Sequence, residues 1–270
     1  MTLQLKKFNM ASIKDNQIIV LIGKRNTGKS VLTKDFLYHK RDIPIGTVVS
    51  PTEGANKYYG DFVPPLFIHD EFSPKLLHNV VKRQKDIITK INRGTYGPDV
   101  DPRAFLIFDD CLYNNDWAKD KNMRYIFMNG RHVKITFILT MQFPLGIPPN
   151  LRTNIDYVFI LRENTTSNRR RIYEHYAGMF PTFDAFNIVM DNCTENFECL
   201  VIHNAAKSNR LDEQVFWYKA EQHPDFRIGS PLLWQYSSDH FDKDGEDDDE
   251  IDINNIGKKN RYTFNVKKLI

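Results

Sequence analysis

The segment QIIVLIGKRNTGKSVLTKDFLYH, residues 17–39, constrains the fold more than any other part of the chain. It begins with a short apolar run, residues 18–22, which is typical of a fully buried strand and is ended by glycine. From about Gly28 to His39 the pattern is that of a helix. A buried strand that leads through a glycine-rich turn into a helix predicts an α/β fold with a ligand at the turn.

The turn fits the phosphate-binding pattern G-x-x-x-x-G-K-[ST] at every fixed position. Its two glycines allow successive backbone N–H groups to point into one concavity, and the helix adds the positive end of its dipole. Lys29 is expected to reach the β- and γ-phosphates, and the Ser30 hydroxyl is expected to ligate Mg²⁺. The alternative, a glycine-rich turn with an incidental lysine, leaves the flanking strand and helix unexplained. The predicted nucleotide-binding residues are Gly23, Lys24, Arg25, Asn26, Thr27, Gly28, Lys29 and Ser30.

A second apolar segment, AFLIFDD at residues 104–110, ends in two carboxylates. Asp109 is expected to hold Mg²⁺ through water, and Asp110 is expected to act as the general base that polarises the attacking water. An aspartate is one methylene shorter than a glutamate, so the reach of Asp110 is open and Glu53 is the alternative base. Both acids could instead be solvated loop residues, but the phosphate loop upstream favours the metal interpretation.

Further apolar runs alternate with helical patterns, which predicts a mainly parallel sheet covered by helices on both faces. One long helix is bounded by Ser73 as N-cap, Pro74 in its first turn and Gly94 after its end. The other predicted strands are residues 46–51, 134–142, 155–163, 197–204 and 213–220, and the other predicted helices are residues 121–132, 169–177 and 182–190.

Charge is distributed unevenly along the chain. The net charge is +3, yet residues 239–252 hold nine acidic residues and one lysine, and the last fourteen residues hold five basic residues and no acid. We therefore predict one P-loop ATPase domain over residues 1–236, a disordered acidic linker over 237–259 and a basic C-terminal segment over 260–270. A chain whose residues 1–238 have a net positive charge and are followed by the acidic segment 239–252 suits a protein that handles a polyanion.

Several classes of protein are disfavoured. No apolar run approaches the ~20 residues of a membrane span, so no membrane span is expected. The N-terminal residues lack an apolar signal core, so we do not expect the chain to be exported. The three cysteines form no C-x-x-C pair and are expected to be small buried hydrophobic residues.

Two residues suggest more than nucleotide binding. Gln142 ends a strand that in this fold class lies between the strand before the phosphate loop, residues 18–22, and the metal strand, residues 104–110. At that position a neutral amide can bond both the γ-phosphate and the attacking water. Arg131 precedes the same strand, at the opposite edge of the sheet, and is suited to reach a neighbouring subunit's nucleotide as an arginine finger. The alternatives are a strand-terminal polar residue for Gln142 and a surface arginine that caps a helix for Arg131.

Together, the segments GKRNTGKS, FLIFDD, GRHVKITFILTMQ, LRTNIDYVFILRE and YAGMFPTFDAF resemble the genome-packaging ATPases of nucleo-cytoplasmic large DNA viruses, the poxvirus-type branch of the FtsK–HerA superfamily. The similarity covers roughly residues 12–220. The first two motifs are shared by many ATPases, whereas the sequence from residue 130 to 163 is specific to far fewer families. Asp110 departs from the glutamate that is commoner in cellular relatives, which leaves the identity of the base open.

The resemblance implies a RecA-like (ASCE) P-loop NTPase that uses ATP and Mg²⁺ and belongs to a ring of identical subunits. Such a ring pumps double-stranded DNA into a preformed capsid, with capsid or portal-like viral proteins as partners. It implies a location at the viral factory in the host cytoplasm, with the virion as a second location. By the same resemblance, the catalytic positions are Asp110, Gln142 and Arg131, and the metal positions are Ser30 and Asp109.

A translocating ring needs cations that grip phosphates without reading bases. Two clusters are candidates, although such runs are commonly solvated helix faces: Lys82, Arg83, Lys85, Lys90 and Arg93 in the first, and Arg169, Arg170 and Arg171 in the second. The alternative functions are an FtsK/HerA-type DNA helicase or translocase, a P-loop nucleotide kinase that uses the arginine triplet as a lid, and a non-catalytic ATP-binding scaffold.

Overall fold

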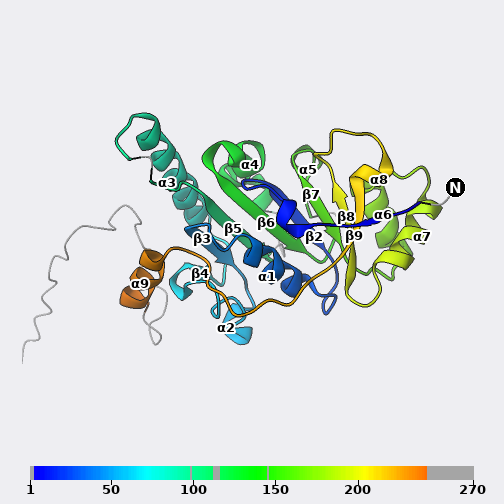
Figure 1. The fold of residues 1–270 in the computed structure, drawn as a ribbon, viewed down its shortest axis with the longest axis horizontal. Coiled ribbons are helices and arrows are strands. Elements are labelled where there is room, and N and C mark those ends of the chain that lie inside the picture. Colours follow the sequence, from blue (N-terminus) through cyan, green and yellow to red (C-terminus); the bar gives the residue numbers. More distant parts are fainter. Residues whose placement is uncertain (1–2, 98, 112–115, 145, 242–270) are drawn as a thin grey trace, which may run out of the picture.

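A nine-stranded sheet forms the centre of the molecule (Figure 1). The computed structural model describes residues 3–97, 99–111, 116–144 and 146–241. The strands lie side by side in the order β1-β9-β8-β7-β2-β6-β5-β3-β4. Their bounds are β1 Lys6–Lys7, β2 Ile18–Ile22, β3 Ile45–Val49, β4 Ile68–His69, β5 Ala104–Asp109, β6 Ile135–Met141, β7 Tyr157–Ile160, β8 Glu198–His203 and β9 Val215–Lys219.

All neighbouring strands are parallel except that β8 is antiparallel to both β7 and β9. The predicted mainly parallel sheet is confirmed. The antiparallel part was not predicted, because an apolar run reveals a buried strand but not the direction of its neighbour.

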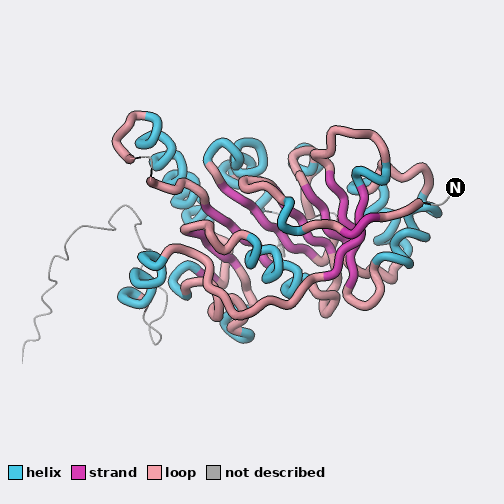
Figure 2. The backbone as a smooth tube through the Cα atoms, in the orientation of Figure 1, coloured by secondary structure: helices cyan, strands magenta, loops and turns pink. Residues whose placement is uncertain are grey.

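Helices cover both faces of the sheet, as predicted (Figure 2). One face packs against α3, α4, α6 and α7, and the other packs against α1 and the loop with Tyr59, Phe62 and Val63. The helices are α1 Lys29–His39, α2 Glu53–Asn56, α3 Pro74–Asn92, α4 Lys121–Asn129, α5 Pro149–Arg152, α6 Thr166–Tyr176, α7 Phe183–Cys193, α8 Leu211–Gln214 and α9 Pro231–His240.

Helix ends follow the local signals where such signals are strong. The Ser73 side chain accepts a hydrogen bond from the backbone N–H of Lys75, so α3 begins as predicted. The helix predicted over residues 121–132 is shorter: α4 ends at Asn129 and a 3₁₀ helix, Gly130–Val133, follows. The 3₁₀ turn lets the chain reverse direction directly into β6, and it places Arg131 outside the α-helix.

The last described helix crosses the predicted end of the domain. Ser230 caps α9 by accepting from the N–H of Leu233, and the buried hydroxyl of Ser237 accepts from the N–H of Leu66. The second contact holds Ser237 against the domain and α9 continues to His240, although we predicted that the acidic linker begins at residue 237. The remainder of that linker and the basic C-terminal segment, residues 242–270, lie outside the described residues.

Two other sequence expectations concern the interior and the membrane. Cys111, Cys193 and Cys199 are all buried with free thiols, as predicted. Burial raises the pKa of each thiol above its usual value. Among the described residues, no helix combines the length and the apolar character needed to cross a bilayer.

Candidate nucleotide-binding site

The phosphate loop joins the carboxyl end of β2 to α1, as predicted. A Cβ atom on Gly23 would lie 2.6 Å from the Thr27 hydroxyl and 2.9 Å from Cβ of Leu161, so no larger residue fits there. Gly28 has φ +103°, in the left-handed region that glycine adopts at little cost. The Thr27 hydroxyl closes the loop by donating to the Lys24 carbonyl at 2.7 Å. The loop is therefore a tight turn at a helix N-terminus, which suits an anion.

Lys29 is buried at the centre of this loop. Its Nζ donates to the carbonyl oxygens of Gly23 at 2.8 Å and of Lys24 at 3.2 Å. The same Nζ lies 3.2 Å from Oδ2 of Asp110. In the structure, the lysine thus holds the loop and the second carboxylate of the metal strand together.

Asp109 is held at the end of β5 by Thr140 of β6, the residue directly beside it in the parallel register. The Thr140 hydroxyl donates to Asp109 Oδ1 at 2.6 Å. Burial raises the pKa of Asp109, and the neighbouring Asp110 carboxylate raises it further. Burial and the Asp109 charge also raise the pKa of the fully buried Tyr59 phenol.

These residues fit a magnesium ion. A bound divalent cation would favour the ionised form of the buried Asp109 carboxylate, and hard oxygen donors are what Mg²⁺ prefers. Ser30, in the first turn of α1, is partly exposed and can supply a hydroxyl oxygen from the phosphate loop. Asp109 and Ser30 are therefore the residues that would hold the ion.

Asp110 has a strained backbone and two cross-strand partners. Its φ is +51°, a region that non-glycine residues seldom adopt, and its N–H donates to the Thr140 hydroxyl at 3.0 Å. Its Oδ2 accepts from Nε2 of Gln142 at 2.9 Å. Because β6 lies between β2 and β5, as expected, the structure brings Gln142, Asp110 and Lys29 into one hydrogen-bonded group.

Glu53, the alternative base, has a different set of contacts. Its two carboxylate oxygens accept from the backbone N–H groups of Tyr59 at 2.9 Å and Gly60 at 2.8 Å. Both oxygens are engaged in holding the loop after α2, which ties this acid to loop structure. Asp110, in contact with Lys29 and Gln142, is the better placed of the two acids for chemistry at the phosphate loop.

Arg131 lies before the amino end of β6, whereas the phosphate loop lies at the carboxyl ends of the strands. The seven residues of β6 separate it from Gln142, and at about 3.3 Å per residue this distance is roughly 20 Å. Its side chain is 57% exposed, and Nη2 is 3.8 Å from Oδ1 of Asp156. Arg131 is thus held loosely at the surface and cannot reach the loop of its own chain.

An acid and a threonine near the loop escaped the sequence analysis. Glu163, after β7, is buried and its Oε1 lies 2.6 Å from Lys24 Nζ, which also donates to the Thr165 hydroxyl at 2.9 Å. Burial alone would raise the pKa of Glu163, but the hydrogen bonds from Lys24 and Thr165 outweigh it and lower the pKa. The motif LRE contained the signal, since an acid that ends a buried strand next to a phosphate loop needs a cation.

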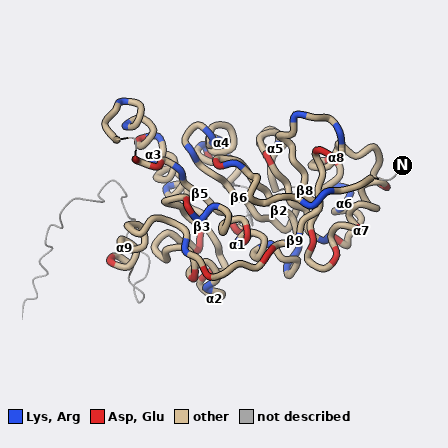
Figure 3. The backbone as a smooth tube through the Cα atoms, in the orientation of Figure 1, with Lys and Arg blue, Asp and Glu red and all other residues tan. Residues whose placement is uncertain are grey.

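The candidate DNA-contacting cations divide into free and engaged side chains. Figure 3 shows basic residues along α3, and both Lys82 of α3 and Arg93, its C-cap residue, are exposed. Lys90 is exposed too, but its Nζ donates to the Tyr96 hydroxyl at 3.2 Å. Arg83 is instead half-buried and donates to the Gln84 side chain, and burial lowers the pKa of its guanidinium to about 10. The Nζ of Lys85, an exposed residue, lies 3.8 Å from the centre of the Tyr125 ring.

The arginine triplet of α6 is mostly occupied by protein contacts. Arg169 donates to the Glu163 carbonyl at 2.6 Å and pairs with Asp191 at 2.7 Å. Arg170 lies over the Phe183 ring, and Arg171 lies over the Phe143 ring. Two of the predicted DNA contacts, Arg83 and Arg169, therefore serve packing within the chain.

Some known proteins are similar to this chain in sequence, and others are similar to it in fold. The protein family described as Poxvirus A32 protein matches residues 5–213. The uncharacterized protein L437 of Acanthamoeba polyphaga mimivirus is 42% identical over 219 residues, which are 80% of this chain and 77% of that protein. The uncharacterized protein 075L of Invertebrate iridescent virus 6 is 41% identical over 206 residues, covering 76% of this chain and 77% of that protein.

Among solved structures, the genome packaging NTPase B204 from Sulfolobus turreted icosahedral virus 2, in complex with ATP-gammaS, has a TM-score of 0.53. The likeness covers 77% of this chain and 98% of that chain at 16% identity, and it shows a shared α/β fold. The pCW3 conjugation coupling protein TcpA, with ATPgS, matches with a TM-score of 0.50 and 12% identity over 76% of this chain and 60% of that chain. The chain therefore belongs to the Poxvirus A32 family and has the fold of the P-loop ATPases.

Proposed function

We propose that the protein is the Mg-ATP-dependent motor that drives double-stranded genomic DNA into the capsid of a large DNA virus. Membership of the A32 family and likeness to a viral genome packaging NTPase support this assignment. The observation that carries it is the contact of Asp110 with both Lys29 and Gln142, at 3.2 Å and 2.9 Å. This contact links the phosphate loop to a polar strand end that can report the state of the nucleotide.

These contacts support the following catalytic cycle. When ATP occupies the loop, Lys29 exchanges its bonds to loop carbonyls and to Asp110 for bonds to phosphate oxygens. Asp110 is then free to accept a proton from the attacking water, and Gln142 orients that water. Ser30 and Asp109 would hold Mg²⁺, which would supply the positive charge that stabilises the triphosphate during hydrolysis.

Each active site is completed by a neighbour. Arg131 is exposed and roughly 20 Å from its own loop by the rise of β6, so it suits the phosphates of an adjacent subunit in a ring. An arginine supplied in this way stabilises the charge of the transition state and contributes about 10³- to 10⁵-fold in rate. Identical subunits, the DNA duplex and capsid or portal-like proteins are the proposed partners, at the viral factory in the host cytoplasm and in the virion.

Phosphate release measured with and without double-stranded DNA tests the proposal. A motor should hydrolyse ATP faster when DNA is added, and Lys29→Ala should abolish the reaction. A nucleotide kinase would instead transfer the phosphoryl group to a nucleoside monophosphate and ignore DNA. Transfer to such an acceptor, with no response to DNA, would overturn the assignment.

A further inference from the structure

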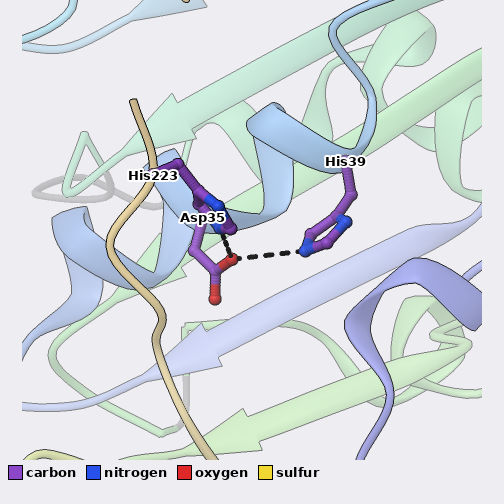
Figure 4. Close-up of side chains that lie close together, drawn as sticks. All are labelled: Asp35, His39 and His223. Atoms are coloured by element: carbon purple, nitrogen blue, oxygen red, sulfur yellow. Dashed lines mark hydrogen bonds and ion pairs between the residues drawn. The ribbon is translucent and has the colours of Figure 1, made fainter. Parts of the chain in front are cut away.

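On the sheet face covered by α1, away from the phosphate loop, three potential metal ligands converge (Figure 4). They are Asp35 and His39 of α1 and His223, which follows β9. One carboxylate oxygen and the two imidazole nitrogens lie within 4.8 Å of one another. Asp35 and His39 are four residues apart, a spacing that places two side chains on one face of a helix.

The second oxygen of Asp35 is fixed from behind. Oδ2 accepts from the Tyr218 hydroxyl at 2.6 Å and from the Glu221 N–H at 3.1 Å. These bonds turn Oδ1 toward the histidines, with Nε2 of His223 at 2.6 Å and Nε2 of His39 at 3.5 Å. Such anchoring of a carboxylate by a hydroxyl and a backbone N–H is how proteins orient metal ligands.

The histidine rings are positioned but not fully bonded. The Tyr38 ring stacks on His223 with centroids 3.8 Å apart and an interplanar angle of 5°. At 3.5 Å, Nε2 of His39 is too far from Oδ1 for a good hydrogen bond although it faces that atom. A hydrogen-bonded Asp–His pair accounts for His223. The His39 ring lies edge-to-face against His223, with centroids 5.3 Å apart, and this packing keeps its Nε2 facing Asp35 Oδ1.

The geometry points to a binding site for a divalent transition-metal ion of the zinc class, with Asp35 Oδ1, His39 Nε2 and His223 Nε2 as ligands. Two imidazoles and one carboxylate are a ligand set that Zn²⁺ accepts, with water as the fourth ligand. His39 and His223 are 23% and 12% exposed, which leaves solvent access for the ion and the water. Ligand atoms around zinc are spaced about 3.3 Å apart, so the His223 ring would move slightly outward on binding.

A bound ion would connect the nucleotide site to the C-terminal part of the chain. Helix α1 begins with Lys29 and Ser30, and His223 lies on the segment that runs from β9 past α1 to α9 (Figure 1). The metal would therefore fasten this segment to the helix of the phosphate loop. Its effect belongs to stability and does not depend on the proposed motor activity.

Zinc titration of the full chain tests the site. The chelator-stripped protein, without nucleotide, competes for Zn²⁺ with a chromophoric chelator, and Co²⁺ is added separately to follow its visible absorption. We expect one equivalent to bind with a Kd below about 1 μM. His39→Ala and His223→Gln should each weaken binding at least about tenfold and remove the cobalt band. The glutamine can still donate to Asp35, which preserves the fold.

The exposed His78 on α3 provides the matched control, because His78→Ala leaves the cluster intact. Zn²⁺ should also raise the Tm of the wild-type and His78→Ala proteins but not that of His39→Ala. Absence of saturable zinc binding, or equal binding by the wild-type and both cluster variants, would overturn the proposal.

A second, independent observation concerns Phe197, in the loop between α7 and β8. Its side chain is 66% exposed, and both Asn196 and Phe197 have left-handed backbones, with φ of 52° and 64°. That conformation is a true outlier for a bulky residue and persists only where the surrounding contacts impose it. The strained loop holds the ring beside the phosphate loop, since a Cβ on Gly28 would be 3.6 Å from Cδ1 of Phe197.

The position of Phe197 relative to the phosphate loop decides which part of a bound nucleotide it would face. Asp109 and Gln142 lie toward β5 and β6, on one side of β2, and Phe197 precedes β8, on the other side. If the terminal phosphate faces the two carboxylates, the nucleoside extends toward β7 and β8. We infer that Phe197 is the platform on which the base of the bound nucleotide stacks, an inference that rests on the proposed nucleotide binding.

Comparing a nucleotide with a base-free ligand isolates this role. Phe197→Ala should weaken the affinity for ATP-gammaS about tenfold, because base–aromatic stacking is lost, while the affinity for inorganic tripolyphosphate stays unchanged. Phe197→Trp should restore the nucleotide affinity, and Leu232→Ala, which removes another exposed apolar side chain on α9, should have no effect. An equal loss for both ligands, or none, would overturn the stacking role, whereas a wild-type chain that binds neither ligand would refute nucleotide binding itself.

Discussion

At the scale of single residues, Asp110 combines a strained backbone with contacts to three other residues of the site. Its left-handed backbone costs about 1–3 kcal/mol and is held by the Thr140 hydroxyl, which accepts from its N–H. The same conformation brings its carboxylate to Lys29 and Gln142. Strain of this kind persists where the surrounding contacts determine it, which agrees with a catalytic role.

The choice between the two candidate bases can be tested directly. Asp110→Asn should reduce ATP hydrolysis by at least about 10²-fold, because the amide cannot accept the proton of the attacking water. Glu53→Gln should retain the chemistry but lower the free energy of unfolding by about 1 kcal/mol, since its carboxylate bonds two backbone N–H groups. Single-turnover phosphate release and urea unfolding measure the two effects. Loss of turnover in Glu53→Gln with Asp110→Asn active would reverse the assignment.

Gln142 should act on turnover and not on nucleotide affinity. In Gln142→Leu the side chain keeps its approximate size but loses the amide, and we expect hydrolysis to fall about 10²- to 10³-fold. A fluorescent ATP analogue should bind with unchanged affinity. Gln235→Leu, an exposed substitution on α9, is the control. Normal turnover in Gln142→Leu would remove the sensor role.

The site was predictable where a residue type is dictated by chemistry. The phosphate loop, the two acids at the end of β5 and the amide after β6 each stand at the end of an apolar strand, and the structure places them together. Thr140 was missed because it is one of two threonines within the otherwise apolar run of β6, and only its register beside Asp109 reveals its function. Asp35 and His223 are 188 residues apart, so the sequence offered no sign that they meet.

At the scale of secondary-structure elements, the central strands were predictable because they are continuous apolar runs. The two-residue strands β1 and β4 were not, since two residues carry no periodicity and exist only through pairing with β9 and β3. The helices α2 and α8 were not predicted either, because four residues are too few to show a helical period.

Ionic contacts at the amino ends of the strands hold several elements together. Asp15, before β2, accepts from Lys40 at 2.7 Å and from Arg103 at 2.9 Å. Arg103, before β5, also bonds Asp42, in the connection between α1 and β3. Burial raises the pKa of Asp15, but the two cations outweigh it and lower the pKa below its usual value of 3.8.

This shift gives a pH dependence of known sign. A carboxyl group with a lowered folded-state pKa contributes stability above its unfolded pKa, and the contribution is lost as pH falls through the folded value. Asp15→Asn should therefore lower the free energy of unfolding at pH 7 by about 1–2 kcal/mol, and the difference from wild type should shrink below about pH 4. Urea unfolding at several pH values measures it. Asp212→Asn, which affects an exposed ion pair with Arg210, should be nearly neutral, and a pH-independent loss in Asp15→Asn would contradict the account.

At the scale of the whole molecule, the exposed cations of α3 and its C-cap residue are the best remaining candidates for DNA contact. Lys82→Gln and Arg93→Gln should each weaken duplex binding and reduce the salt dependence of log K by about 1, because one phosphate contact is lost. Fluorescence anisotropy at several salt concentrations measures both quantities. Lys219→Gln, at an exposed position in β9, is the control. An unchanged salt slope in both α3 variants would place the DNA elsewhere.

The central claim is that each active site is shared between two subunits, and mixing two inactive variants tests it most directly. Lys29→Ala lacks the loop lysine, and Arg131→Ala lacks the arginine for its neighbour, so each should be inactive alone while Arg131→Ala still binds nucleotide. In equimolar mixtures on DNA, about one quarter of the interfaces would pair an intact loop with an intact arginine. The account predicts that ATP turnover reappears in the mixture; turnover that stays at the level of the separate variants, or an Arg131→Ala protein that is fully active alone, would contradict it.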